Sequence, residues 1–235
     1  MNRYFKRGLL AISLLLWANI VSANLLINPT RVQFNQSDRS AEVTLINTSN
    51  ATTTYRLEWA EKQAKAGGGY DDLSVEEAKS FPIASSMLRF SPRQVTLQGG
   101  ERQTVKLALR RPRDLPDGEY RSHLLFKALP PPSAADVDEG GESASLSINI
   151  VLSFAIPVVI RQGETDYTVN FNNATIHYQP GTNNGEVVVT MDRAGMHSVV
   201  GDIEAYWTPR GGEERLIAKT GEYSLWSELD QANTS

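Results

Sequence analysis

Cysteine is absent from this 235-residue sequence, and histidine occurs only three times. Without cysteine there is no disulfide scaffold, no thiol nucleophile and no cysteine-ligated metal centre. The three histidines lie far apart, and none has the HExxH spacing of a zinc site. No GxSxG, P-loop or GxGxxG motif is present. The sequence therefore predicts no metal, cofactor or catalytic residue, and a hydrolase on a β scaffold would need a pocket in which histidine and carboxylate converge.

Excess positive charge is also lacking. The chain has 23 Lys and Arg against 27 Asp and Glu, a net charge of -4. Nucleic-acid binding needs clustered Lys and Arg that replace phosphate counterions, and no such cluster occurs. We therefore expect no nucleic-acid partner.

Long hydrophobic runs are missing except near the N-terminus. Arg3, Lys6 and Arg7 precede the apolar run Leu9–Trp17, and Val21–Ala23 places small residues where a signal peptidase reads them. Residues 1–23 are predicted to be a cleavable signal peptide rather than a membrane anchor, because a bilayer span needs about 20 apolar residues. Its removal takes away three basic residues and leaves 20 basic and 27 acidic ones. We expect an acidic protein exported to a Gram-negative periplasm, with no stable membrane insertion after cleavage.

Apolar residues after the signal peptide alternate with polar ones in short runs separated by turn residues. This period of two is typical of antiparallel β-sandwiches. The runs of the first half are at residues 32–34, 41–46, 55–59, 95–97, 105–109 and 120–127. A short helical turn fits only residues 73–80, and the segment 130–142, rich in proline, glycine and acidic residues, is predicted to be a mobile loop.

An unusually long strand is predicted at residues 145–161, SLSINIVLSFAIPVVIR. Leu146, Ile148, Ile150 and Leu152 lie on one of its faces. At about 3.3 Å per residue this strand exceeds most strands of globular proteins. Pro157 cannot donate a ladder hydrogen bond, so it fits an edge or a bend. A loop leading into the strand suggests an accessible edge.

A second sandwich is predicted after a hinge at residues 162–165. Short alternating runs continue to about residue 229 and give about six strands, fewer than the seven of an immunoglobulin-like sandwich. The predicted fold is all-β, with two immunoglobulin-like domains, residues 24–161 and 162–235, set at an angle. The second domain is expected to be incomplete.

Three separated motifs resemble those of the PapD-like periplasmic chaperones of the chaperone-usher pathway, in the form typical of the archaic or alternative branch. They are TRVQF at residues 30–34, LPDGEYRSHL at 115–124 and IPVVIR at 156–161. Their order and spacing cover nearly the whole exported chain.

The resemblance implies a chaperone that lends a strand to fimbrial subunits whose own sandwiches lack their last strand. Leu146, Ile148, Ile150 and Leu152 match the positions of that strand, and we call them the donor residues. Burial of four such aliphatic side chains contributes roughly 6–12 kcal/mol before the entropy of association is subtracted. Arg31 matches a cation that holds the subunit's terminal carboxylate. The implied partners are fimbrial subunits and an outer-membrane usher.

The sequence departs from the better-known branch of the family at one position. Pro157 stands where a second anchoring lysine is expected, so Arg121 or another cation of the cleft is left as a candidate. Glu119 and Arg161 match a family ion pair that bridges the two domains. These roles come from the resemblance and not from spacing alone.

The alternative function is a fimbrial structural subunit or adhesin built from the same kind of sandwich. A subunit is expected to carry a short donor extension before its first domain. Here the long apolar strand is internal and ends at a hinge, which favours the chaperone.

Overall fold

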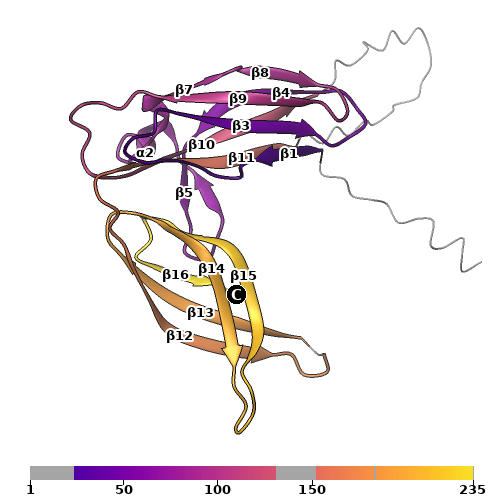
Figure 1. Ribbon diagram of the computed structural model, residues 1–235, viewed down its shortest axis with the longest axis vertical. Coiled ribbons are helices and arrows are strands. Elements are labelled where there is room, and N and C mark those ends of the chain that lie inside the picture. Colours follow the sequence, from indigo (N-terminus) through magenta and orange to yellow (C-terminus); the bar gives the residue numbers. More distant parts are fainter. Residues whose placement is uncertain (1–23, 131–151, 183, 235) are drawn as a thin grey trace, which may run out of the picture.

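The computed structural model describes residues 24–130, 152–182 and 184–234. Two sheets of the first half face each other as a sandwich, the upper body in Figure 1. One sheet has the order β1 (Leu25–Asn28), β3 (Ser40–Asn47), β9 (Arg102–Leu109) and β7 (Leu88–Ser91). The other has the order β2 (Val32–Phe34), β11 (Ser153–Gln162), β10 (Gly118–Leu129), β4 (Thr53–Ala60) and β8 (Gln94–Leu97).

The core of this first sandwich follows from the alternation of apolar residues. In β3, Val43 and Leu45 are fully buried, and the adjacent strand β9 contributes Val105 and Leu107 in the same way. Each such side chain contributes about 1.5–3 kcal/mol through the removal of apolar surface from water. The largest buried apolar side chains of the opposite sheet are Phe34, Tyr55, Leu97, Leu124, Phe126 and Ile160.

A hairpin and two short helical turns interrupt the strands between β4 and β7. The hairpin consists of β5 (Lys62–Ala64) and β6 (Tyr70–Asp72) and extends from the first sandwich toward the second (Figure 1). It is followed by α2 (Val75–Ala78) and the 3-10 turn η1 (Ser85–Met87). Ser74 caps α2, because its backbone N–H donates to the Glu77 carboxylate at 2.8 Å while its hydroxyl accepts from the Glu77 N–H at 3.4 Å.

The second sandwich has two smaller sheets. They are β12 (Thr168–Tyr178), β13 (Gly185–Ala194) and β16 (Gln231–Thr234), and β14 (Val199–Trp207) with β15 (Arg215–Leu225). Among its described residues, the buried apolar cluster has four members, Val189, Met191, Leu225 and Ala232. Phe171, Ile176 and Tyr178 of β12, an edge strand paired with β13, are 58–64% exposed.

The predicted all-β fold with two immunoglobulin-like sandwiches at an angle is confirmed (Figure 1). β11 ends at Gln162 and the chain turns through Gly163, whose φ of +83° is a left-handed value that favours glycine. The domain limits 24–161 and 162–235 remain predictions. The predicted signal peptide and most of the predicted loop 130–142 lie outside the described residues. Within the described part of the chain, no helix is long and apolar enough to cross a bilayer.

Candidate functional site

A cleft of about 410 Å³ lies where the two sandwiches meet. Arg31 enters it from the turn that precedes β2, and Tyr70 enters it from the hairpin β5–β6. Pro157 of β11 forms part of its wall. The second sandwich supplies Val200, Glu222, Ser224 and Trp226. The cleft is therefore composite, with walls from segments that lie far apart in the sequence.

The Arg31 guanidinium is held by neutral groups of the second sandwich. Its Nη1 donates to the Ser224 hydroxyl at 3.3 Å, and its Nη2 donates to the Ser198 hydroxyl at 3.1 Å. The Trp226 ring lies 4.5 Å from the guanidinium carbon, within the range of a cation–π contact. Among the described residues, no carboxylate forms an ion pair with Arg31.

The pKa of Arg31 is lowered to about 10, mainly by burial; the Glu119 carboxylate opposes this shift, and the positive charge of Arg161 contributes to it. The side chain therefore stays charged at neutral pH. A half-buried cation without an ion-pair partner favours an anionic ligand, because the anion restores electrostatic interactions that burial removed.

Glu119 and Arg161 form an ion pair on the adjacent strands β10 and β11, with 3.2 Å between Arg161 Nε and Glu119 Oε2. The same carboxylate oxygen accepts from the Ser198 N–H at 3.0 Å and from the Ser198 hydroxyl at 2.7 Å. Arg161 also donates to the Ser198 carbonyl. This pair of the first sandwich thus binds the backbone of the second sandwich at the residue that also contacts Arg31.

Arg121 forms an ion pair that does connect the two sandwiches. Its guanidinium binds both carboxylate oxygens of Glu228, and one of these oxygens also accepts from the Ala64 N–H at 2.9 Å. The two side chains are 3% and 12% exposed. The Trp226 ring lies 4.2 Å from the Arg121 guanidinium carbon. The sequence leaves Arg121 open as a second anchor, but in the structure its charge is already paired with a carboxylate of this chain.

His123 lies opposite Pro157 in the register of β10 and β11 and is 1% exposed. Neither ring nitrogen has a hydrogen-bond partner among the described residues. The Tyr70 ring packs edge-on against it at 4.7 Å. Burial, with the positive charges of Arg121 and Lys62, lowers the pKa of His123 to about 3, and the Asp72 carboxylate opposes this effect only weakly. His123 is therefore neutral at physiological pH.

We expect His123 to destabilise the fold in acid. Its pKa is about 3 in the folded protein and about 6.5 in the unfolded chain, so between these pH values the unfolded chain binds more protons. From pH 7 to 4.5 this residue should therefore lower the free energy of unfolding by about 2–3 kcal/mol. Urea denaturation at both pH values measures the change. His123→Phe should remove this part of the pH dependence, and the same substitution at the exposed His177 should retain it.

The strand β11 has an open edge next to the cleft. It pairs with β10 along its whole length, but β2 pairs with it only at residues 158–160. Among the described residues, no strand covers the other edge of β11 at residues 153–157. Ile156 is 4% exposed in the core, whereas Leu152, four residues earlier and of the same parity, is 49% exposed. The donor residues Leu146, Ile148 and Ile150 lie outside the described residues.

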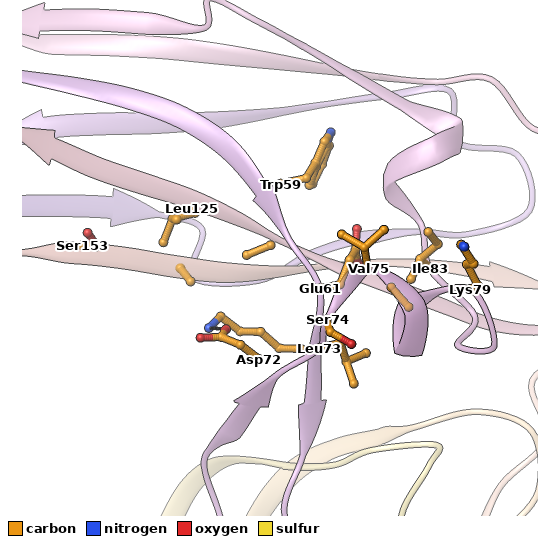
Figure 2. A pocket seen from close by; sticks show the side chains of 14 residues that line it. Trp59, Glu61, Asp72, Leu73, Ser74, Val75, Lys79, Ile83, Leu125 and Ser153 are labelled. Atoms are coloured by element: carbon orange, nitrogen blue, oxygen red, sulfur yellow. Dashed lines mark hydrogen bonds and ion pairs between the residues drawn. The ribbon is translucent and has the colours of Figure 1, made fainter.

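A wider groove of about 890 Å³ lies on the first sandwich, beside the start of β11 (Figure 2). Trp59, Val75 and Leu125 line it together with Ser153. Its charged lining residues are engaged within the chain: the Glu61 carboxylate accepts from the Ser122 hydroxyl at 2.6 Å, and Lys62 pairs with Asp72. The groove therefore presents a mainly apolar surface. Within the described ranges, no three histidine or acidic side chains converge as metal ligands would.

Sequence comparison identifies the family. A model of the pili and flagellar-assembly chaperones, PapD N-terminal domain, matches residues 24–163, which is more than half of the chain. The chain belongs to this family of pilus-assembly chaperones. The predicted resemblance and the predicted chaperone function in fimbrial assembly are confirmed, and the alternative of a structural subunit is not favoured.

Solved structures similar to this chaperone share little of its sequence. The archaic Csu chaperone–tip subunit pre-assembly complex of Acinetobacter baumannii has 14% identity and a TM-score of 0.48, with 91% of this chain and 87% of that chain covered. The E. coli chaperone DraB has 13% identity and a TM-score of 0.48, with coverage of 89% and 82%. The Pseudomonas aeruginosa chaperone CupB2 has 12% identity and a TM-score of 0.46, with coverage of 88% and 87%. A search of curated proteins found no match.

Several residues that line the cleft or bind its arginines could not be recognised from the sequence. Tyr70, Trp226 and Glu228 each stand in segments without a motif, and Ser198 and Ser224 are ordinary serines of a β-rich chain. Their place in the cleft depends on how the second sandwich and the hairpin β5–β6 meet the first sandwich. Only Arg31, Glu119, Arg121, Pro157 and Arg161 were singled out beforehand.

Proposed function

We propose that this chaperone binds pilus subunits by donating the strand that carries Leu146, Ile148, Ile150 and Leu152 to an incomplete subunit sandwich. It then keeps the subunit soluble in the periplasm and delivers it to an outer-membrane usher. Its own role in this process is binding rather than catalysis.

The open edge of β11 carries this proposal. At residues 153–157 the backbone groups on that edge have no strand partner in the described part of the chain. An unpaired edge accepts an added strand, with main-chain hydrogen bonds for affinity and alternate side chains in pockets for specificity. The donor residues share the parity of Ile156, and Leu152 has already left the chaperone's own core. We expect their side chains to enter the core of a partner.

Arg31 supports the same proposal from the cleft. A subunit strand that pairs along β11 needs an end point that defines its register, since a slip by one residue exchanges the two faces of a strand. Arg31 precedes β2, whose Val32 pairs with Val158, so it lies beside Pro157 at the point where the open edge ends. A terminal carboxylate bound there would set the register.

Co-expression with a candidate pilus subunit tests the function. We expect a stable complex of one chaperone and one subunit after affinity purification, and a subunit that aggregates when the chaperone is omitted. A subunit that stays equally soluble alone, with no complex recovered, would rule out this function for that pair.

Arg31→Ala is expected to lower the yield of this complex far more than Arg110→Ala. Loss of a hydrogen bond to a charged group costs about 1.5–3 kcal/mol, or roughly 10- to 150-fold in affinity. Arg110 is an exposed arginine of the first sandwich and serves as the matched control. Arg31→Lys keeps the charge but not the planar fork, so it should retain only part of the yield. Equal effects of the two alanine substitutions would contradict the anchor.

A further inference from the structure

A peptide carboxylate offers two oxygens to its binding site, and each accepts hydrogen bonds. In the cleft, Arg31 supplies one charged donor group, bound for the present to two serine hydroxyls. The other carboxylate oxygen needs a second hydrogen-bond donor in the same cleft. The inference below rests on the proposed function, because it concerns the carboxylate that Arg31 is proposed to hold.

The other cationic side chains near the cleft already form ion pairs within the chain, so they are poor candidates for the second donor. Arg121 is bound by both oxygens of Glu228, Arg161 is paired with Glu119, and Lys62 is paired with Asp72. Removal of any of them from its partner would leave a carboxylate unpaired, at a high cost where that carboxylate is buried. His123 is buried and neutral. A second donor in the described part of the cleft must therefore be a neutral group.

Tyr70 has the position and the chemistry for this role. It lines the same cleft as Arg31, and 37% of its surface is exposed. Its ring is fixed by the edge-on contact with His123 and by the Trp226 ring, 6.2 Å away between centroids. Burial raises the pKa of Tyr70, although the positive charges of Arg121 and Arg31 oppose this effect. The phenol therefore keeps its proton at neutral pH and can donate it.

We propose that the Tyr70 hydroxyl donates the second hydrogen bond to a peptide carboxylate held by Arg31. The hairpin β5–β6 is then part of the binding site as well as a bridge between the sandwiches. Glu222, the acidic residue on the cleft wall, is exposed and repels an anion only weakly through solvent. Arg31 attracts the carboxylate by its charge, and the hydrogen bond from Tyr70 orients the carboxylate without adding a charge to the cleft.

A small-molecule titration tests this residue without any subunit. The probes are N-acetyl-leucine as the free acid and N-acetyl-leucinamide, added to the isotope-labelled chaperone while the indole N–H signal of Trp226 is followed by NMR. We expect the acid to bind more tightly than the amide. Tyr70→Phe should weaken binding of the acid by roughly 10- to 150-fold and leave binding of the amide nearly unchanged, since only a hydrogen bond to a charged group is lost.

Tyr178→Phe is the matched control. Tyr178 is an exposed tyrosine of the second sandwich whose hydroxyl donates to the Thr182 carbonyl at 2.9 Å, away from the cleft. Tyr178→Phe should leave the affinities for the acid and for the amide unchanged. Phenylalanine at position 70 retains the ring that packs on His123, so the fold is expected to persist and an unchanged NMR spectrum elsewhere would show it.

The outcomes separate this inference from the proposed function. An acid affinity that is equal in wild type and Tyr70→Phe overturns the role of Tyr70 and leaves Arg31 as the anchor. If the wild-type protein binds the acid no more tightly than the amide, the proposed carboxylate-binding roles of both Arg31 and Tyr70 are wrong. Strand donation is tested separately by subunit co-purification. A preference for the acid that depends on Tyr70 supports the inference even where a chosen subunit forms no complex.

Discussion

Replacing Ile148 and Ile150 together with aspartate is expected to abolish recovery of a subunit complex while the first sandwich stays folded. Two aliphatic side chains contribute about 3–6 kcal/mol when fully buried, which corresponds to a loss of roughly 100-fold or more in affinity. Two carboxylates placed in an apolar groove add a further desolvation cost. Co-purification of the subunit measures the complex, and circular dichroism of the free chaperone measures its fold.

The matched control is the double substitution of Ser147 and Asn149 with aspartate. It adds the same two charges to the same segment, at positions of the opposite parity. Because side chains alternate between the two faces of a strand, the control should leave most of the complex intact. A similar loss in both variants would mean that charge in the segment, and not an apolar donor face, decides binding. Full recovery with both isoleucines replaced would remove the donor assignment altogether.

Glu228→Gln is expected to cause the largest loss of stability among single substitutions in the cleft. Arg121 is 3% exposed and would keep a buried charge without its carboxylate. Removal of one partner from a buried ion pair typically costs about 3–5 kcal/mol. Urea denaturation followed by tryptophan fluorescence should detect the change directly, since Trp226 packs on the Arg121 guanidinium.

Glu204→Gln provides the comparison for this prediction. Glu204 pairs with Lys219 on the exposed surface of the second sandwich, at 2.8 Å. Exposed ion pairs add little to stability, so the urea midpoint should hardly move. If the double variant Arg121→Met with Glu228→Gln is more stable than Glu228→Gln alone, the unpaired charge is the cause of the loss. Equal midpoints for Glu228→Gln and wild type would show that the pair does not hold the sandwiches together.

The strands were predicted well where a run of alternating residues has one buried face. β3, β4, β9 and β10 agree with the runs at residues 41–46, 55–59, 105–109 and 120–127. Strands without this alternation were missed. β5 and β6 have three residues each, and β6 is wholly exposed, so nothing in their polarity distinguishes them from the loop around residues 67–69. β1 was missed next to the predicted cleavage site.

The site was predicted in part, through motifs rather than through charge. The motif at residues 30–34 singled out Arg31, and the structure places it in the cleft. The sequence did not decide whether Arg121 is a free cation. That depends on Glu228, which stands 107 residues later. No local pattern reports such a contact, because it exists only once the loop between β15 and β16 packs against the hairpin β5–β6.

The sequence by itself determined the class of fold and the family, and it predicts an apolar face at residues 146–152. These properties follow from the two-residue alternation of apolar and polar side chains and from short motifs, and both signals are local in the sequence. Only the tertiary structure decided which cation of the cleft has no ion-pair partner in the described part of the chain, and which neutral groups surround it. The partner of each charged side chain can lie far away in the sequence. Burial then determines the strength of the electrostatic interaction between them. The neutral surroundings of Arg31 and the position of Tyr70 are therefore properties of the two sandwiches together.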